Sequence, residues 1–357
     1  MSRKSAERKF DQTADEHQRN FVSLIKQFSY GHHLDSVFRD FVELAALAIS
    51  NSVDRGQFDA REKRYLEIVG KYKKEEVARF PLMLAEITLA FDKRVGVMAA
   101  ARERGVMASN LTDVLGQTYM MLDLGNDRSG QFFTPYHVSK LMAGMIGGDA
   151  VARADAQGFA RVHEPACGAG GMVIATAEAF HDAGLNYQQT MHATCIDIDP
   201  CCVHMTYLQL ALLHIPAIVV HGNALTMEVW GHWFTPAHVL GGWNRKLRAR
   251  RSHDAMRSIM RAVPAADDDG ELAQELANGP VAVEPEDGMP VIEEAEARVE
   301  VVTDEALEVA VLDRPVVEVD AAVSDDAGAL ADLFDEIVST PARPVDVFEV
   351  IDQLTLF

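Results

Sequence analysis

Apolar side chains recur at helical spacing throughout the first third of the chain. Within 34–49 they fall three and four residues apart, at Leu34, Val37, Phe38, Phe41, Val42, Ala45, Ala48 and Ile49. This period places them on one face of a helix. Further helices are predicted at about 59–73, 75–93 and 111–124, the last with Asn110 as its N-terminal cap and Gly125 as its stop. We therefore expect a helical N-terminal domain over residues 1–125.

The pattern changes after a polar loop at about 125–130. Thr134 and Pro135 can serve as the cap and the first residue of a helix that Gly147 and Gly148 would end. Three predicted strands then alternate with helices: Arg161–Glu164, Met191–Asp197 and Ala217–His221. Because strands that alternate with helices form parallel sheets with right-handed crossovers, the expected fold class is α/β, over residues 126–244.

Charge separates the chain into a near-neutral body and an acidic tail. Residues 262–357 carry 26 Asp and Glu but only three Arg, a net charge of −23, whereas residues 1–261 carry a net charge of +2. A segment with so much like charge and so few aromatic residues has little apolar surface to bury. We therefore expect residues 262–352 to form a disordered acidic tail.

Basic residues gather just before this tail, in residues 245–261. Arginine and lysine bind the phosphates of DNA, so this segment is a candidate DNA-binding surface. The candidate DNA-binding residues are Arg245, Lys246, Arg248, Arg250 and Arg251. A solvated linker helix would have the same composition, and that alternative stays open.

Composition excludes several classes of protein. No segment approaches the roughly 20 apolar residues of a membrane helix, and Met1 is followed by charged residues without the apolar stretch of a secretory signal. We expect no membrane partner and a cytoplasmic location, which a count of four cysteines also favours. Cys201 and Cys202 are adjacent and no second pair exists, so we expect buried thiols and no metal site.

A glycine-rich turn follows the first predicted strand. Its sequence is Glu164-Pro165-Ala166-Cys167-Gly168-Ala169-Gly170-Gly171. Glycine lets the backbone turn tightly and lets a ligand approach, and the N–H groups at the start of the following helix suit a polar or anionic cofactor group. No Gly-Lys-Ser/Thr follows, so the turn is not a Walker phosphate loop. Considered alone, the turn fits a tight packing turn equally well.

Polar side chains also end the next two strands. Asp197 occupies the position at which doubly wound folds bind ribose hydroxyls, while Asp199 and Pro200 can cap and open the next helix. Asn223, after the third strand, offers a donor and an acceptor to a base edge. The three strands therefore predict a site for a cofactor with a ribose and a base.

These motifs, preceded by Gly130-Gln131-Phe132-Phe133-Thr134-Pro135, come in the order seen in adenine-N6 DNA methyltransferases. Over about residues 30–225 the chain most resembles the modification subunit of type I restriction systems and related phage and plasmid enzymes. The resemblance implies a Rossmann-like unit that binds S-adenosyl-L-methionine and acts on double-stranded DNA. It implies cofactor contacts at these positions: Phe132, Thr134, Pro135, Glu164, Pro165, Ala166, Gly168, Gly170, Asp197 and Asn223.

The resemblance also implies a role for each group of contacts. Thr134 would lie near the carboxylate of the cofactor, and Glu164 with the glycine-rich turn would line its methionine and ribose part. Asp197 would hold the ribose hydroxyls. Asn223 stands where the family usually has an aspartate.

The catalytic motif of the family, Asn/Asp-Pro-Pro-Tyr/Phe, is absent, because no two prolines of this chain are adjacent. In the family, the amide and a main-chain carbonyl of this motif accept hydrogen bonds from the target amino group. Its aromatic ring stacks on a base flipped out of the duplex. Only about 40 residues separate Asn223 from the acidic tail, so we expect a truncated Rossmann-like unit, and the catalytic residues stay unassigned. One interpretation is a divergent base pocket formed by Trp230, His232, Trp233, Phe234 and His238. The others are aromatic core packing and a cofactor-binding unit that no longer transfers methyl groups.

The last five residues resemble a known short motif. Gln353-Leu354-Thr355-Leu356-Phe357 is similar to the pentapeptide by which bacterial replication and repair proteins bind the DNA sliding clamp. Leu356 and Phe357 would fill an apolar pocket while Gln353 forms hydrogen bonds at its rim, and Leu354 completes the partner-binding residues. The alternative is a terminal segment packed on the body of the protein.

Together these observations predict an S-adenosylmethionine-dependent adenine-N6 DNA methyltransferase of a restriction-modification system, or a close relative. Because the catalytic motif is missing, we expect catalysis to be either lost or dependent on a partner, such as a specificity subunit or a second methyltransferase subunit. The alternative function is a non-catalytic, cofactor-binding adaptor that associates with DNA and is recruited to the sliding clamp.

Overall fold

The computed structural model describes residues 14–28, 31–106, 108, 110–122, 124, 133–262 and 354–355. The chain divides into two compact units, Met1–His253 with Pro344–Phe357, and Asp254–Arg343. Of the second unit, the described residues are 254–262, at the end of one helix. The predicted acidic tail lies outside the described residues, as do Phe132, Gln353, Leu356 and Phe357 and the side chain of Leu354.

The N-terminal region is helical where it is described. Its elements are α2 (Glu16–Lys26), α3 (Leu34–Val53), η1 (Arg55–Gln57), α4 (Phe58–Val69), α5 (Lys74–Val77), α6 (Arg79–Glu103) and α7 (Val114–Met121). The apolar stripe predicted on α3 is confirmed at Val37, Phe38 and Val42, which are fully buried, whereas Ala48 is exposed. The cap of α7 is Asp113, whose carboxylate accepts from the Gly116 N–H at 2.8 Å. The expected cap at Asn110 is therefore wrong, because Asp113 supplies the oxygen nearer the helix.

Helix α8 (Tyr136–Gln157) differs from its prediction at both ends. Its cap residue is Pro135, not Thr134, and the helix passes through Gly147 and Gly148 to end at Gly158, which has φ of 81°. A Cβ at Gly147 would lie 3.6 Å from the Ala179 side chain of α9 (Gly171–Asp182). This is an ordinary van der Waals distance, so Gly147 lies inside the packed helix and does not end it.

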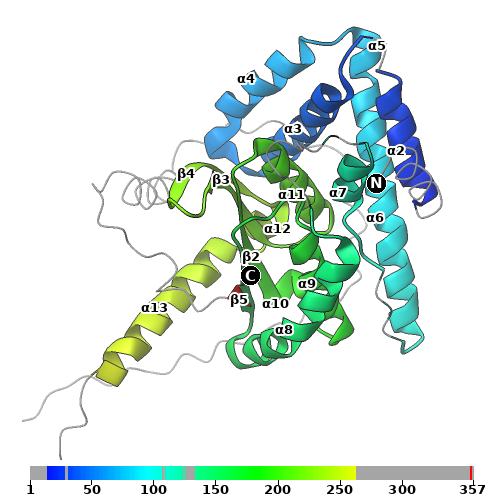
Figure 1. Ribbon diagram of the computed structural model, residues 1–357. Coiled ribbons are helices and arrows are strands. Elements are labelled where there is room, and N and C mark those ends of the chain that lie inside the picture. The colour runs from blue at the N-terminus through cyan, green and yellow to red at the C-terminus, as the bar shows by residue number, and fades with distance from the viewer. Residues whose placement is uncertain are drawn as a thin grey trace, which may run out of the picture. The chain divides into compact units, whose positions relative to one another are not determined.

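A mixed sheet forms the centre of the α/β region (Figure 1). Its strands are β1 (Ala160–Glu164), β2 (Met191–Asp197), β3 (Ala217–Asn223), β4 (Glu228–Phe234) and β5 (Leu354–Thr355), in the order β4-β3-β2-β1-β5. The parallel pairing predicted for β1, β2 and β3 is confirmed. Strand β4 pairs antiparallel with β3 and was not predicted. At the other edge, β5 runs parallel to β1 with Leu354 opposite Val162.

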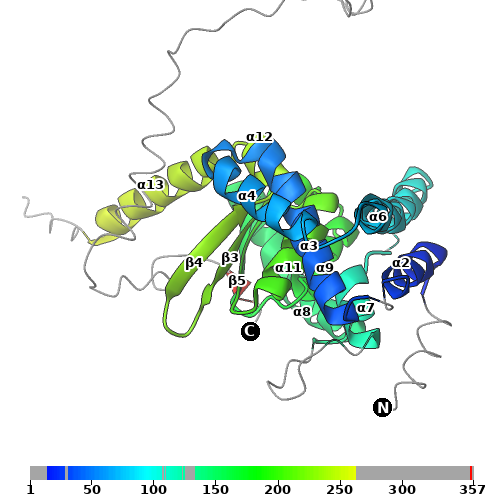
Figure 2. The same cartoon turned by 90° about the horizontal axis from the view of Figure 1, so that it is seen from above.

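Four further helices belong to the α/β region or follow it. They are α10 (Tyr187–Thr190), α11 (Pro200–Leu212), α12 (Pro236–Leu240) and α13 (Trp243–Ala262). Helix α11 contacts β2 and β3 and also packs on α3, as Figure 2 shows. One continuous apolar core includes Phe38 of α3, Leu208 of α11 and Val219 of β3. Among the described residues, none of the helices combines the length and apolar composition needed to cross a bilayer.

Candidate cofactor-binding site

The carboxyl edge of the sheet gathers the predicted residues of three strands. Glu164 ends β1, Asp197 ends β2 and Asn223 ends β3. The turn after β1 reaches the neighbouring strand, because the Gly168 N–H donates to Asp197 Oδ2 at 2.8 Å. The structure therefore joins two motifs that lie 29 residues apart in the sequence.

Two glycines of this turn have the left-handed conformation that favours glycine. Gly168 has φ of 54° and Gly170 has φ of 89°. A Cβ at Gly168 would lie 3.0 Å from the ring of Phe133, and one at Gly170 would lie 3.2 Å from Thr206 Oγ1. The Thr206 hydroxyl in turn donates to the Gly168 carbonyl at 2.9 Å. Conformation and close packing thus both require glycine in the turn.

Backbone donors orient the Asp197 carboxylate. Besides the Gly168 N–H, it accepts the Asp199 N–H through Oδ1 at 2.9 Å. The side chain of Asp199 caps α11 by accepting from the Cys201 N–H, and Pro200 opens the helix, so the predicted start of this helix is confirmed. Burial raises the pKa of Asp197, and these backbone hydrogen bonds oppose the increase.

Glu164 is the most perturbed acid of the edge. Its Oε1 accepts from the Ala166 N–H at 3.2 Å, whereas Oε2 is buried and has no hydrogen-bond partner among the described residues. Burial, with a smaller contribution from the nearby Asp197, raises the pKa of Glu164 to about 8. A buried carboxyl oxygen is unfavourable without a partner. A ligand hydroxyl or ammonium group would supply that partner, so these residues fit a polar cofactor.

The other predicted contacts differ in exposure. Pro165 is half-buried and Ala166 is exposed in the turn, while Thr134 and Pro135 are exposed before α8. The side chain of Asn223 stabilises the β3–β4 turn, because its Oδ1 accepts from the Leu225 N–H at 2.9 Å. Its carbonyl oxygen thus has a local structural role in addition to any contact with a ligand.

The sequence did not predict the buried side chain that supports the glycine-rich turn, which is Gln209. Gln209 of α11 donates to the Ala169 carbonyl at 2.6 Å and to Asp113 Oδ1 at 2.7 Å, and its own oxygen accepts from the Leu115 N–H at 3.1 Å. Gln209 is fully buried, so it connects α7 to the turn inside the core. Its signal in the sequence is a single amide within a mostly apolar helical segment.

Phe133 was also missed as a contact of the turn. Its ring lies against Gly168 and tilts against the ring of Tyr119, with the two centroids 5.4 Å apart. Phe133 adjoins the predicted contact Phe132 in the sequence.

Three of the five aromatic residues near β4, His232, Phe234 and His238, form a series of ring contacts with centroids 4.8 and 4.9 Å apart. Trp230 is half-exposed near the carboxyl edge and contacts the ring of His221 at 5.0 Å. Trp233 instead packs inside, with the Arg61 guanidinium 4.1 Å from its ring centroid, and His238 is fully buried. This arrangement agrees with aromatic core packing and not with a base pocket built from the whole set.

The predicted DNA-binding residues lie on α13, which begins at the opposite edge of the sheet. Its Trp243 contacts the rings of Phe159, which precedes β1, and His192, near the start of β2. A seven-residue strand such as β2 separates the two edges by about 20 Å. Within the helix, Arg250 is half-buried and the other predicted contacts, Arg245, Lys246, Arg248 and Arg251, are exposed.

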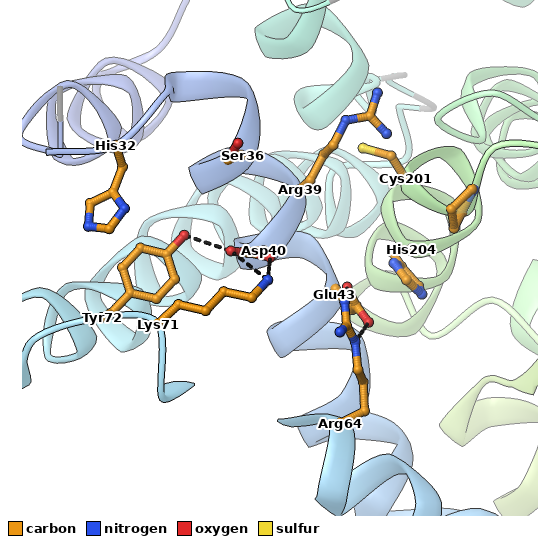
Figure 3. A pocket seen from close by; sticks show the side chains of 11 residues that line it. His32, Ser36, Arg39, Asp40, Glu43, Arg64, Lys71, Tyr72, Cys201 and His204 are labelled. Atoms are coloured by element: carbon orange, nitrogen blue, oxygen red, sulfur yellow. Dashed lines mark hydrogen bonds and ion pairs between the residues drawn. The ribbon is translucent and has the colours of Figure 1, made fainter. Parts of the chain in front are cut away.

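A pocket of about 410 Å³ lies between α3 and the start of α11 (Figure 3). Four residues of α3 at helical spacing line it: Ser36, Arg39, Asp40 and Glu43. Its charges are largely paired, because Arg64 Nε binds Glu43 at 2.6 Å and Lys71 Nζ binds Asp40 at 3.0 Å. Cys201 and His204 of α11 line the opposite wall of the pocket.

The four cysteines are free and buried, as predicted. Burial raises the pKa of the Cys167 and Cys195 thiols. Within the part of the chain that the structure describes, no group of three or more His, Cys, Asp or Glu side chains could hold a metal ion.

Fold and site together describe an α/β domain whose carboxyl sheet edge carries polar side chains and a glycine-rich turn. Residues 111–240 match the family described as N-6 DNA Methylase. The matched segment runs from the start of α7 through α12 and contains β1 to β4. The resemblance to adenine-N6 DNA methyltransferases is thereby confirmed for this part of the chain. No curated protein matches the chain.

Proposed function

We propose that the protein binds S-adenosylmethionine at the carboxyl edge of its sheet and acts in adenine-N6 methylation of DNA. The observation that carries the proposal is the contact between the Gly168 N–H and Asp197, beside Glu164 Oε2, which has no hydrogen-bond partner among the described residues. The match of residues 111–240 to the N-6 DNA methylase family supports the same function. When bound, this cofactor supplies an electrophilic methyl group.

The residues of the edge divide the binding between them. The Asp197 carboxylate accepts hydrogen bonds from two backbone N–H groups. Its remaining lone pairs can accept hydrogen bonds from the ribose hydroxyls. The Glu164 carboxyl group forms a hydrogen bond with a polar group of the methionine part of the cofactor. The turn at Gly168 allows the cofactor to approach the backbone. Thr134 and Pro135, exposed at the start of α8, complete the binding surface.

Isothermal titration calorimetry tests this proposal. The wild-type protein should bind S-adenosylmethionine, Asp197→Ala should weaken binding by at least tenfold, and Asp149→Ala, which removes an exposed carboxylate of α8, should leave it unchanged. Nicotinamide dinucleotide serves as the rival ligand for this fold. Absence of binding at millimolar S-adenosylmethionine, or equal binding by Asp197→Ala, would refute the proposal.

Methyl transfer is a separate step, for which we propose that a partner subunit is required. The stretch that follows β3 contains no Asn/Asp-Pro-Pro-aromatic motif. Incubation with tritiated S-adenosylmethionine and duplex DNA, with and without a methyltransferase or specificity subunit, should label adenine only when the partner is present. Labelling by the chain alone would refute the requirement.

A second candidate function is a non-catalytic adaptor that binds the cofactor and DNA. The observation in its favour is that the segment after β3 is used to build β4 and α12, where Thr235 accepts from the His238 N–H as the cap of α12. The adaptor would bind DNA through Arg245, Lys246, Arg248, Arg250 and Arg251. Its affinity should fall steeply with salt, without methylated product in any reaction.

The C-terminal pentapeptide is proposed to recruit the protein to the bacterial sliding clamp. Exchange of Leu356 and Phe357 for alanine should abolish capture on an immobilised clamp. Unchanged capture would show that the motif is a coincidence. Deletion of 262–357 should tighten DNA binding only if the acidic tail masks the basic segment.

A further inference from the structure

A continuous series of polar contacts joins the N-terminal helices to the candidate cofactor edge. Arg39 of α3 donates from Nη1 to Asp199 Oδ1 at 3.0 Å. The Asp199 N–H donates to Asp197 Oδ1 at 2.9 Å, and Asp197 Oδ2 accepts from the Gly168 N–H at 2.8 Å. Three short contacts thus connect a helix of the N-terminal region to the glycine-rich turn.

The guanidinium of Arg39 is held in a fixed orientation. Its Nε binds Asp35 Oδ1 at 3.1 Å, and its Nη2 donates to the Tyr119 hydroxyl at 3.1 Å. Figure 3 shows the Arg39 side chain extending from α3 to the side of Cys201, the second residue of α11. Because all three guanidinium nitrogens are engaged, both the position and the charge of Arg39 are specified.

The charge of Arg39 matters because the edge is crowded with acids. Asp197 and Asp199 are two residues apart, and the charge of Asp199 disfavours ionisation of Asp197. Glu164 adds a third carboxyl group close to Asp197. Arg39 forms the ion pair with Asp199, at 3.0 Å, and so offsets the negative charge that acts on Asp197.

We infer that Arg39 is a positioning residue for the cofactor site. Through Asp199 it holds Asp197 in the position and orientation in which the Asp197 carboxylate accepts hydrogen bonds from the ribose hydroxyls. This inference rests on the proposed binding of S-adenosylmethionine. It assigns the N-terminal helices a part in ligand binding, although none of their side chains is among the predicted contacts.

Calorimetry with S-adenosylmethionine on a small set of full-length variants tests the inference. Arg39→Gln should weaken binding about tenfold. Asp199→Asn should have a similar effect, because asparagine still caps α11 but has no charge to pair with Arg39. Arg39→Lys, which keeps the positive charge, should restore part of the affinity. Arg64→Gln is the matched control, since it removes another ion pair of the same pocket, with Glu43.

The double variant separates a positioning role from general loss of structure. If Arg39 acts through Asp199, Arg39→Gln should cause no further loss of affinity once Asp199→Asn is present. Additive losses, or full affinity in Arg39→Gln, would refute the inference while wild-type binding still supports the proposed function. Absence of binding by the wild-type protein would refute both. Thermal unfolding of each variant identifies any that fail to fold, and Asp199→Asn then decides.

Discussion

Replacement of Glu164 by glutamine should remove a pH-dependent loss of stability. Burial and the nearby Asp197 raise the pKa of Glu164 from 4.5 to about 8. Between these two values the folded chain keeps a proton that the unfolded chain has released, so the free energy of unfolding falls as the pH rises. Below this range both states are protonated and above it both are ionised, which confines the effect to that window.

The magnitude follows from the width of this window. One proton of difference corresponds to about 1.4 kcal/mol per pH unit, so the wild type should lose roughly 3 kcal/mol between pH 4.5 and 7 through Glu164. Glu164→Gln has no titratable group there and should lack this part of the pH dependence. The other ionisable groups are the same in both proteins, so the difference between the two isolates Glu164.

Urea denaturation between pH 5 and pH 8, followed by circular dichroism, measures this difference. The two proteins should diverge steadily as the pH rises. Parallel curves would show that Glu164 ionises as freely in the folded protein as in the unfolded one. That result would contradict the effect of burial on the Glu164 carboxyl group.

Further predictions concern the turn, its support and the core. In urea denaturation, Gly168→Ala should destabilise the fold by about 1–2 kcal/mol more than Gly158→Ala. Both glycines have positive φ, but only Gly168 is close to another side chain. Equal losses of stability in the two variants would contradict this. Gln209→Leu should lower the free energy of unfolding by about 3 kcal/mol, since it leaves buried partners unpaired, and a loss below 1 kcal/mol would contradict that role. Burial lowers the pKa of His238 to about 4, so stability should fall as the pH drops from 6.5 toward 4, and less so in His238→Gln; identical acid unfolding curves would refute this.

Local patterns in the sequence were sufficient for most of the elements. Helical periodicity predicted α3, and the alternation of strands with helices predicted the parallel centre of the sheet. The start of α11 was predicted correctly because a cap such as Asp199, followed by Pro200, is a local signal that adjacent residues determine.

Strand β4 could not be predicted from such patterns. Its segment, Glu228–Phe234, contains Gly231 and lacks clean alternation of apolar and polar residues. The turn before it has no glycine, and Met227 takes a positive φ of 62° instead. Antiparallel pairing with β3 depends on tertiary contacts, such as the packing of Trp233 under Arg61, that no local signal contains.

In the candidate site too, local signals predict some features and tertiary contacts determine the others. The positions of Glu164, Gly168 and Asp197 follow from the order of strands and turns. Their supporting contacts join residues far apart in the chain: Arg39 and Asp199 are 160 positions apart, and Gln209 and Asp113 are 96 positions apart. Only the packing of α3 and α7 on α11 brings these pairs together.

The four buried thiols allow local opening of the native protein to be measured through the rate at which they are modified. A water-soluble thiol reagent reaches a buried cysteine only after the structure around it opens, so the rate of modification reports the free energy of that opening. Cys167 lies in the glycine-rich turn, whereas Cys195 lies in the central strand β2. Faster modification of Cys167 would reveal excursions of the turn that leave the sheet intact. A ligand held by the turn would suppress those excursions and slow the modification of Cys167 first.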